Sequence, residues 1–200
     1  MLPPLSLYVH VPWCEKKCPY CDFNSHSIPG AHRFLSKELE ESYFSALIRD
    51  MKKSLLHVDN RELESIFFGG GTPSLLSSDI FSKLIRELRN MVSFKFDIEI
   101  TLEVNPSSAE ARKFEGFRDA GVNRLSIGVQ SFNSRHLKRI GRVHSQNDAR
   151  LALNLAAKYF DNFNVDLMYG LPNQTLEETD QDIRNVIGAQ PTHISFYNLT

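Results

Sequence analysis

The 200-residue sequence lacks a long apolar run, an excess of charge of either sign, and more than three cysteines. Its 23 lysines and arginines nearly balance 24 aspartates and glutamates, so nothing in the charge points to nucleic acid or to an acidic membrane surface. No apolar run approaches the roughly 20 residues that a membrane-spanning helix needs. The first residues, MLPPLSLYVHVP, lack the basic start and cleavage site of a signal peptide. We therefore expect a cytoplasmic protein without a nucleic-acid partner or a transmembrane segment.

The chain also lacks internal repeats and any linker rich in proline, glycine or serine. Its length suits one sizeable domain, so we expect residues 1–200 to form a single core. The last strand-like run ends one residue before the C-terminus, with no helix after it. We therefore expect the chain to stop where a second region would begin.

Strand-like runs alternate with helix-favouring segments along the whole chain. The strand-like runs lie at 5–11, 65–69, 96–104, 124–130, 163–169 and 193–199. The helix-favouring segments lie at 34–56, 75–91, 108–121, 145–159 and 175–188, with Ser78 or Asp79 as the N-cap of the second and Gly121 ending the third. Repeated strand–helix units predict a parallel α/β sheet with right-handed crossovers. A closed eight-unit barrel takes about 250 residues, so we expect a partial (β/α)6 TIM-like barrel, with a doubly wound open sheet as the alternative.

Alternation within these runs gives each strand one apolar and one polar face. Phe96, Ile98 and Ile100 share the apolar face of the third strand, whereas Glu99 and Glu103 share the polar one. The helices must cover the apolar faces, so the polar faces point inward. Polar side chains near the ends of the strands are Tyr8, Glu103, Gln130 and Asp166, together with the backbone at Gly70. Unpaired buried polar groups cost about 1–3 kcal/mol each, so we expect a polar ligand among them. The alternative is a two-layer sheet with one wet face.

All three cysteines follow the first strand directly, in the order WCEKKCPYCDF. The spacing C-x3-C-x2-C of Cys14, Cys18 and Cys21 predicts a soft-metal site, and three thiolates on a four-iron cluster leave one iron open for a small molecule. Lys16 and Lys17 add positive charge that favours thiolates. Tyr20 and Phe23 are placed to shield the cluster. A zinc site completed by His26 or His10 is the alternative.

Other motifs lie at the expected strand ends. The segment FFGGGTPSLL permits a close approach of backbone amides to a ligand, or it is simply a tight turn. TLEVNP carries Glu103, whose carboxylate can accept hydrogen bonds from ribose hydroxyls. Arg142 lies in RIGRVHS, where a solvated surface arginine is the alternative.

Taken in order, the motifs resemble one branch of the radical S-adenosylmethionine (SAM) superfamily, the branch of oxygen-independent coproporphyrinogen oxidases and haem chaperones. They are YVHVPWCEKKCPYCDFNSH, FFGGGTPSLL, TLEVNP, GVNRLSIGVQSF, LKRIGRVH and VDLMYGLPNQT, and they cover essentially the whole chain. The resemblance implies that the open iron of a [4Fe–4S] cluster is chelated by the amino and carboxylate groups of SAM. An electron from the cluster then yields methionine and a 5'-deoxyadenosyl radical.

The resemblance also implies roles for single positions. Tyr8 lies beside the methionine part of SAM, and Glu103 is an acidic SAM ligand. Gly70, Gly71 and Thr72 match the glycine-rich segment that meets SAM. Gln130, Arg142 and Asp166 match residues that contact a second SAM in the oxidases, and whether one or two SAM molecules bind here stays open.

Within the branch, CPYCDFNSH and IGVQSF are most similar to the haem chaperones. The oxidases carry a further cysteine shortly after the third, where this chain has Asp22, Phe23 and Asn24. We therefore expect a haem chaperone that passes haem to apoproteins, with radical decarboxylation of coproporphyrinogen III and a zinc-binding structural module as alternatives. A reductant such as flavodoxin or ferredoxin is the implied partner. Members of the branch continue into a C-terminal region, so we expect this chain to hold a cluster but to handle tetrapyrrole poorly.

Overall fold

The computed structural model describes residues 2–28 and 35–199, so Phe34, at the start of the first expected helix, lies outside the described residues. A six-stranded parallel sheet forms its centre, in the order β1-β4-β5-β6-β7-β8. These strands are β1 (Leu5–Val11), β4 (Leu63–Gly70), β5 (Phe94–Val104), β6 (Arg124–Gln130), β7 (Phe163–Tyr169) and β8 (His193–Asn198). The principal helices are α1 (Lys37–Ser54), α2 (Ser78–Met91), α6 (Gln146–Tyr159) and α7 (Leu176–Gly188).

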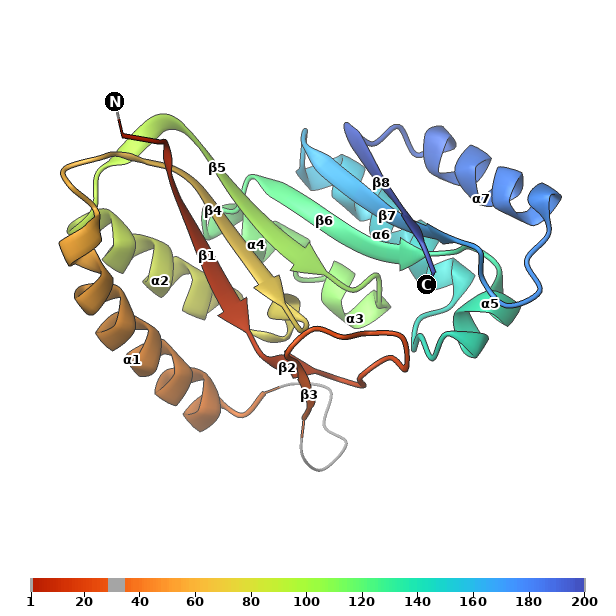
Figure 1. Cartoon of the computed structure of the whole chain (residues 1–200), viewed down its shortest axis with the longest axis horizontal. Helices are drawn as coiled ribbons and strands as arrows, with labels where there is room; N and C mark the ends of the chain where they lie inside the picture. Colours follow the sequence, from red (N-terminus) through yellow and green to blue (C-terminus); the bar gives the residue numbers. More distant parts are fainter. Residues whose placement is uncertain (1, 29–34, 200) are drawn as a thin grey trace.

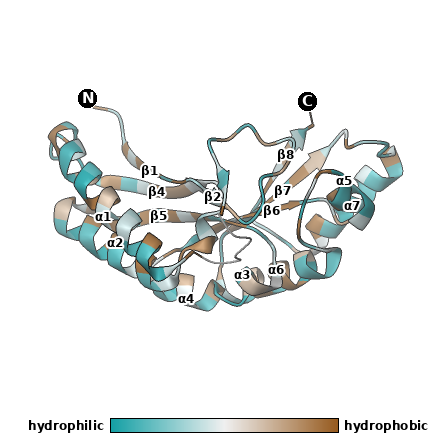
Figure 2. Ribbon diagram, turned by 90° about the horizontal axis from the view of Figure 1, so that it is seen from below, coloured by the Kyte–Doolittle hydropathy of each residue, from teal (hydrophilic) through white to brown (hydrophobic). Residues whose placement is uncertain are grey.

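The strand order identifies the architecture. The six strands of this sheet lie side by side in the order in which they occur along the chain. A doubly wound sheet would instead reverse the strand order at one point. The helices all lie along one side of a curved sheet, and the other side stays open (Figures 1 and 2). Within the described residues, β1 and β8 each pair with a single neighbour, so the barrel is not closed. The expected partial barrel is confirmed, and the open, concave side is where a ligand has access.

Packing under the helices explains the stability of this curved layer. The buried stripe of α2 includes Phe81, whose ring lies edge-on to Phe68 of β4 at 5.0 Å and to Phe117 at 5.5 Å. All three rings are fully buried. Each large apolar side chain contributes about 1.5–3 kcal/mol on full burial, so this aromatic group is a major anchor of the sheet.

Several local predictions were wrong because tertiary contacts decided them. The N-cap of α2 is Ser77 rather than Ser78 or Asp79. The buried carboxylate of Glu40 accepts hydrogen bonds from the backbone N–H of Ser77 at 2.6 Å and from the Ser77 hydroxyl at 2.9 Å, which holds Ser77 at the start of the helix. The segment expected as one helix at 108–121 forms two short ones, α3 (Ser108–Ala111) and α4 (Phe114–Asp119). Gly121 ends α4 at a φ of 106°, as expected.

The sequence analysis missed three short elements and misplaced one side chain. The missed elements are β2 (Trp13–Cys14), β3 (His26–Ser27) and α5 (Ser134–Arg139). Phe96 was expected under a helix but is fully exposed. The pairing of β4 with β5 jumps from Leu63–Phe94 to Ser65–Glu99, so Phe96 falls in an irregular part of the ladder that no helix covers.

None of the helices in the described part of the chain is both long and apolar enough to span a bilayer.

Candidate cofactor site

The cysteine segment folds over the carboxyl edge of the sheet. β2 continues from β1 and pairs with β3, so the chain returns to its starting point after the third cysteine. The His26 N–H donates to the Pro12 carbonyl at 2.7 Å, and the Ile28 N–H donates to the Cys14 carbonyl at 2.9 Å. This pairing closes the base of the loop that carries the cysteines.

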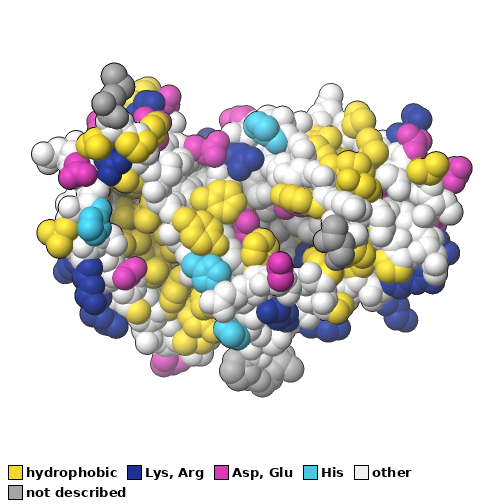
Figure 3. All heavy atoms as spheres, in the orientation of Figure 1, with side chains coloured by type: hydrophobic (Ala, Val, Ile, Leu, Met, Phe, Trp, Pro, Cys, Tyr) yellow, Lys and Arg dark blue, Asp and Glu magenta, His cyan; other side chains and the backbone are white. Residues whose placement is uncertain are grey.

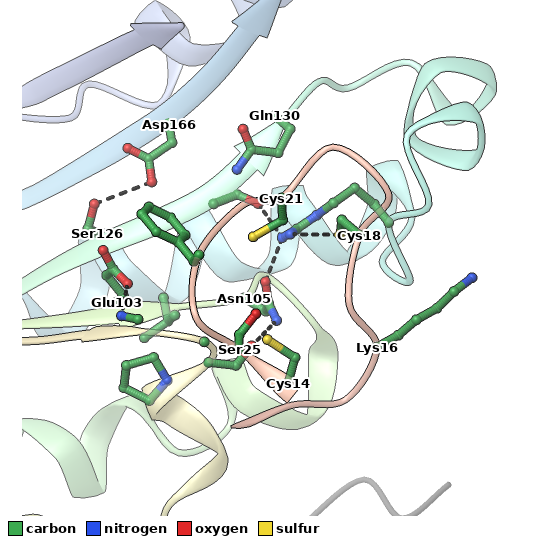
Figure 4. A pocket seen from close by; sticks show the side chains of 18 of the residues that line it. Cys14, Lys16, Cys18, Cys21, Ser25, Glu103, Asn105, Ser126, Gln130 and Asp166 are labelled. Carbon is green, nitrogen blue, oxygen red and sulfur yellow. Dashed lines mark hydrogen bonds between the residues drawn. The ribbon is translucent and has the colours of Figure 1, made fainter. Parts of the chain in front are cut away.

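All three cysteines are free thiols and line one cavity on the open side of the sheet. Figure 3 shows the surface hollowed over the middle of the sheet, with acidic, histidine and hydrophobic side chains around the hollow. Figure 4 shows the cysteines along one wall of this cavity, with Glu103 and Asp166 on the sheet opposite. The structure thus brings nearly all the predicted site residues to one place: Cys14, Cys18, Cys21, Gly70, Gly71, Thr72, Glu103, Gln130, Arg142 and Asp166.

Tyr8 is the predicted site residue that does not line this cavity. Its side chain is 56% exposed on the inner face of β1, stacks on Phe67 and shares a hydrogen bond with His10. Tyr8 therefore borders the open part of the lumen beside the cavity.

The donor set suits a multinuclear cluster better than a single metal ion. Among the described residues, no three His, Cys, Asp or Glu side chains lie close enough to share one ion. His10 is engaged by Tyr8 and the Asn24 carbonyl, and neither His10 nor His26 lines the cavity. A mononuclear Cys3His zinc site therefore finds no support in the arrangement. Of the two lysines expected to favour thiolates, Lys17 donates instead to the Phe23 carbonyl at 3.0 Å.

The glycine-rich segment is required for close packing of β4 against β1 and β2. A side-chain carbon at Gly71 would lie 2.5 Å from the Trp13 carbonyl oxygen, and Gly70 has a φ of 113°. The Gly71 N–H donates to the Val11 carbonyl, and the Thr72 N–H donates to the Trp13 carbonyl. Gly70 and Gly71 thus lie on the cavity wall, but the backbone N–H groups of this segment already donate to Glu103, β1 and β2. A ligand can therefore approach the Cα atoms and carbonyl groups of the two glycines rather than their N–H groups.

Glu103 and Asp166 face the same cavity from neighbouring parts of the sheet. Glu103 Oε2 accepts from the Gly70 N–H at 3.0 Å. Burial raises the pKa of Glu103 to about 7. The hydrogen bond from Gly70 lowers this pKa in part, and the nearby charge of Asp166 raises it further. Burial also raises the pKa of Asp166, although Asn164 and Ser126 donate hydrogen bonds to its carboxylate. Both shifts therefore arise chiefly from burial, and for Asp166 the nearby positive charge of Arg124 offsets the rise only in part.

The raised pKa of Glu103 makes a prediction for stability. Its protonated form favours folding, so its contribution is complete below pH 4.5 and is lost as the pH rises to about 7. At 1.36 kcal/mol per unit, the free energy of unfolding of the apoprotein should fall by about 3 kcal/mol over this range relative to Glu103→Gln. Urea unfolding at pH 4.5 and pH 8 measures the difference. The exposed control Glu115→Gln should show none, and a pH-independent difference for Glu103→Gln would contradict the prediction.

Arg142 is not a solvated surface arginine. Its Nη1 donates to Cys18 Sγ at 3.8 Å, and its Nη2 donates to Asn105 Oδ1 at 2.5 Å and to the Gly128 carbonyl at 2.7 Å. The guanidinium therefore connects the cysteine loop to the ends of β5 and β6. Its Nε is buried without a hydrogen-bond partner.

Asn105, the buried Glu110 and the partly buried Lys113 support this arrangement. Asn105 Nδ2 donates to Thr72 Oγ1 at 3.1 Å, so this amide bridges the glycine-rich segment and Arg142. Glu110 accepts from the Ser74 hydroxyl and from the Asn105 N–H. Lys113 Nζ donates to the Ser74 carbonyl at 3.0 Å. Glu110 and Lys113 thus hold the loops after β4 and β5 together.

Gln130 is placed by a contact from the opposite side of the sheet. Its φ is 68°, in the left-handed region, where the chain turns out of β6. Asp182 of α7 accepts from the Ser131 hydroxyl at 2.6 Å and from the Phe132 N–H at 2.8 Å. These two hydrogen bonds fix the residues that follow Gln130, and the Gln130 side chain lines the cavity.

Three polar side chains of the cavity lining were not among the predicted site residues: Ser25, Asn105 and Ser126. Asn105 and Ser126 occur in motifs already singled out, and Ser126 lies on the polar face of β6, so alternation alone could have found it. Ser25 sits in an irregular segment, where no periodic signal exists. Its hydroxyl and Arg142 Nε are both buried, lack a partner and line the cavity, so the residues fit a polar group beside the thiols.

Comparisons with known proteins agree with this geometry. The family model described as the radical SAM superfamily matches residues 8–186. The chain is 48% identical to the heme chaperone HemW of Haemophilus influenzae and 46% identical to that of Escherichia coli, over its full length and 52% and 51% of theirs. Among solved structures, coproporphyrinogen III oxidase (HemN) of E. coli superposes with a TM-score of 0.86 at 33% identity, over 98% of this chain and 44% of that one. The chain thus spans about half the length of the curated relatives it matches.

Proposed function

The chain belongs to the radical SAM superfamily, and from that premise we propose that Cys14, Cys18 and Cys21 hold a [4Fe–4S] cluster whose remaining iron binds SAM. Three free thiols on one cavity wall, with two partnerless buried polar atoms beside them, support this assignment. The cysteines are the only ones in the chain, so no protein thiol is left for the fourth iron.

We further propose that the protein serves as the radical SAM core of a haem chaperone, which delivers haem to apoproteins. The similarity to the HemW chaperones over the whole chain is the observation that carries this proposal. The absence of a cysteine at Asp22, Phe23 and Asn24 also favours a chaperone over an oxidase. Haem is then cargo, and a flavodoxin- or ferredoxin-type protein is the reductant. Free thiols at a metal site suit the reducing cytoplasm, where we place the protein.

Each group of cavity residues has a separate task in this proposal. When bound, the cluster and SAM supply one-electron chemistry. Glu103 has one carboxylate oxygen engaged by Gly70, which leaves the other for ribose hydroxyls. Gln130 and Asp166 present polar atoms farther along the sheet, where they can orient one SAM or a second one. Arg142 donates a hydrogen bond to Cys18 and so fixes the position of that sulfur relative to the ends of β5 and β6.

Anaerobic reconstitution tests the proposal in two steps. The first step expects about four irons per chain and a change in the EPR signal of the reduced cluster when SAM is added. A colourless protein with stoichiometric zinc would instead support the structural module. The second step measures haem binding and haem transfer to an apoprotein, with the full-length H. influenzae relative as positive control.

The oxidase alternative has its own readout. Incubation with coproporphyrinogen III, SAM and a reductant should yield no protoporphyrinogen, and its formation would establish the oxidase.

A further inference from the structure

The hydroxyl of Ser25 stands out among the buried polar atoms of the described residues. Ser25 is 2% exposed, and its Oγ has no hydrogen-bond partner. It lines the same cavity as the cysteines. A buried hydroxyl without a hydrogen-bond partner lowers the stability of the fold. A ligand in the cavity that hydrogen-bonds to this hydroxyl would remove that cost.

The backbone around Ser25 is held from both sides. The Ser25 N–H donates to the Phe23 carbonyl at 2.7 Å, and the Asn24 carbonyl is 2.8 Å from His10 Nε2. The next residue, His26, pairs with Trp13 in the β2–β3 ladder. The hydroxyl is therefore presented at a defined place rather than by a free loop, and the third cysteine is only four positions before it.

The surroundings of Ser25 have few other free polar groups. In Figure 4 its side chain lies between Cys14 and Asn105. Asn105 already bridges Thr72 and Arg142 through its own amide. The backbone N–H groups of Gly71 and Thr72 donate to β1 and β2. The Ser25 hydroxyl is thus a donor and acceptor without a partner on the cavity wall that Cys14 also lines.

We propose that the Ser25 hydroxyl binds the amino-carboxylate end of SAM, an inference that rests on the proposed function. This end must approach the iron held by the cysteines. Ser25 directly precedes β3, where Ser27 pairs with Cys14, whereas Glu103 and Asp166 lie on the sheet across the cavity. A hydroxyl can donate to a carboxylate oxygen or accept from an ammonium group. Hydrogen bonds to charged groups are worth about ten- to hundredfold in affinity.

The test compares Ser25→Ala with Ser27→Ala, each loaded with the cluster. Ser27 is the matched control, because its exposed hydroxyl accepts from the Lys17 N–H instead of lining the cavity. Anaerobic equilibrium dialysis measures binding of SAM and of 5'-deoxy-5'-methylthioadenosine, which lacks the amino-carboxylate end. We expect Ser25→Ala to weaken SAM binding about tenfold or more and to leave the second ligand within about twofold. Ser27→Ala should change neither.

Stability separates a binding role from a structural one. Removing a partnerless buried hydroxyl should leave the apoprotein at least as stable in urea, whereas a structural serine would lose stability. Unchanged SAM affinity in Ser25→Ala, or equal weakening of both ligands, would overturn this inference while the proposed function stands. A wild-type chain that loads no cluster or binds no SAM would overturn both.

Discussion

Replacing Cys18 by alanine is expected to abolish the iron–sulfur cluster. Reconstituted iron should fall from about four atoms per chain to near zero, and the SAM-dependent EPR change should disappear with it. The reason is the count of ligands, because the chain has three cysteines and no spare thiol to replace a missing one. Arg142, which donates to Cys18 Sγ, would then lose its contact in the cysteine loop.

Iron and acid-labile sulfide analysis together with anaerobic absorption spectra measure this loss. Asp22→Ala is the matched control, since Asp22 is an exposed residue one position after Cys21 and should keep full iron content. Circular dichroism of both apoproteins should match the wild type, because the partial barrel is held by its own core. A Cys18→Ala protein that still binds about four irons and responds to SAM would refute the three-cysteine assignment.

Replacing Glu110 by alanine is expected to cost the apoprotein about 3–5 kcal/mol in free energy of unfolding. Glu110 is buried, accepts from Ser74 and from the Asn105 N–H, and compensates the charge of Lys113. Its removal leaves the partly buried Lys113 ammonium uncompensated and leaves three donors without this acceptor, namely the hydroxyls of Ser74 and Ser107 and the Asn105 N–H. Burial raises the pKa of Glu110 and lowers that of Lys113, so the attraction between the two charges and their separate hydrogen bonds act against a desolvation cost.

Urea unfolding at pH 7 measures the effect. Glu115→Ala, at an exposed position of α4, should change stability by less than about 0.5 kcal/mol. The double variant Glu110→Ala, Lys113→Met should recover part of the loss, because it removes the uncompensated charge. A loss below about 1 kcal/mol for Glu110→Ala, or no recovery in the double variant, would show that this pair does not hold the loops after β4 and β5.

Much of the fold was predictable because its signals are local. Alternation within each run identified the six strands of the sheet and the face that points into the lumen. The strand expected at 124–130, for example, has the same first and last residues as β6. The capped helices were equally accessible, since Ser145 and Thr175 each begin a capping box within four residues. The errors occur where a distant group overrides local preference, as when Glu40 of α1 moves the start of α2 to Ser77.

The candidate site shows the same division. Motif spacing brought attention to the cysteines, the glycine-rich segment, Glu103, Gln130, Arg142 and Asp166, and the structure places these residues around one cavity. Spacing could not reveal that the amides of Gly71 and Thr72 are already used by β1 and β2. It also could not place Tyr8 outside the cavity lining, because that depends on how the sheet curves.

The sequence by itself determined the family, the spacing of the three cysteines and the succession of strands and helices along the chain, because each of these is written in short segments of neighbouring residues. Only the tertiary structure decided which polar atoms meet in the cavity. Arg142 reaches Cys18 across 124 positions of the chain, and Ser25 lies on the cavity wall directly before β3, which pairs with β2. Contacts of this kind depend on how the strands are ordered and how the sheet bends, and neither property has a local signature in the chain.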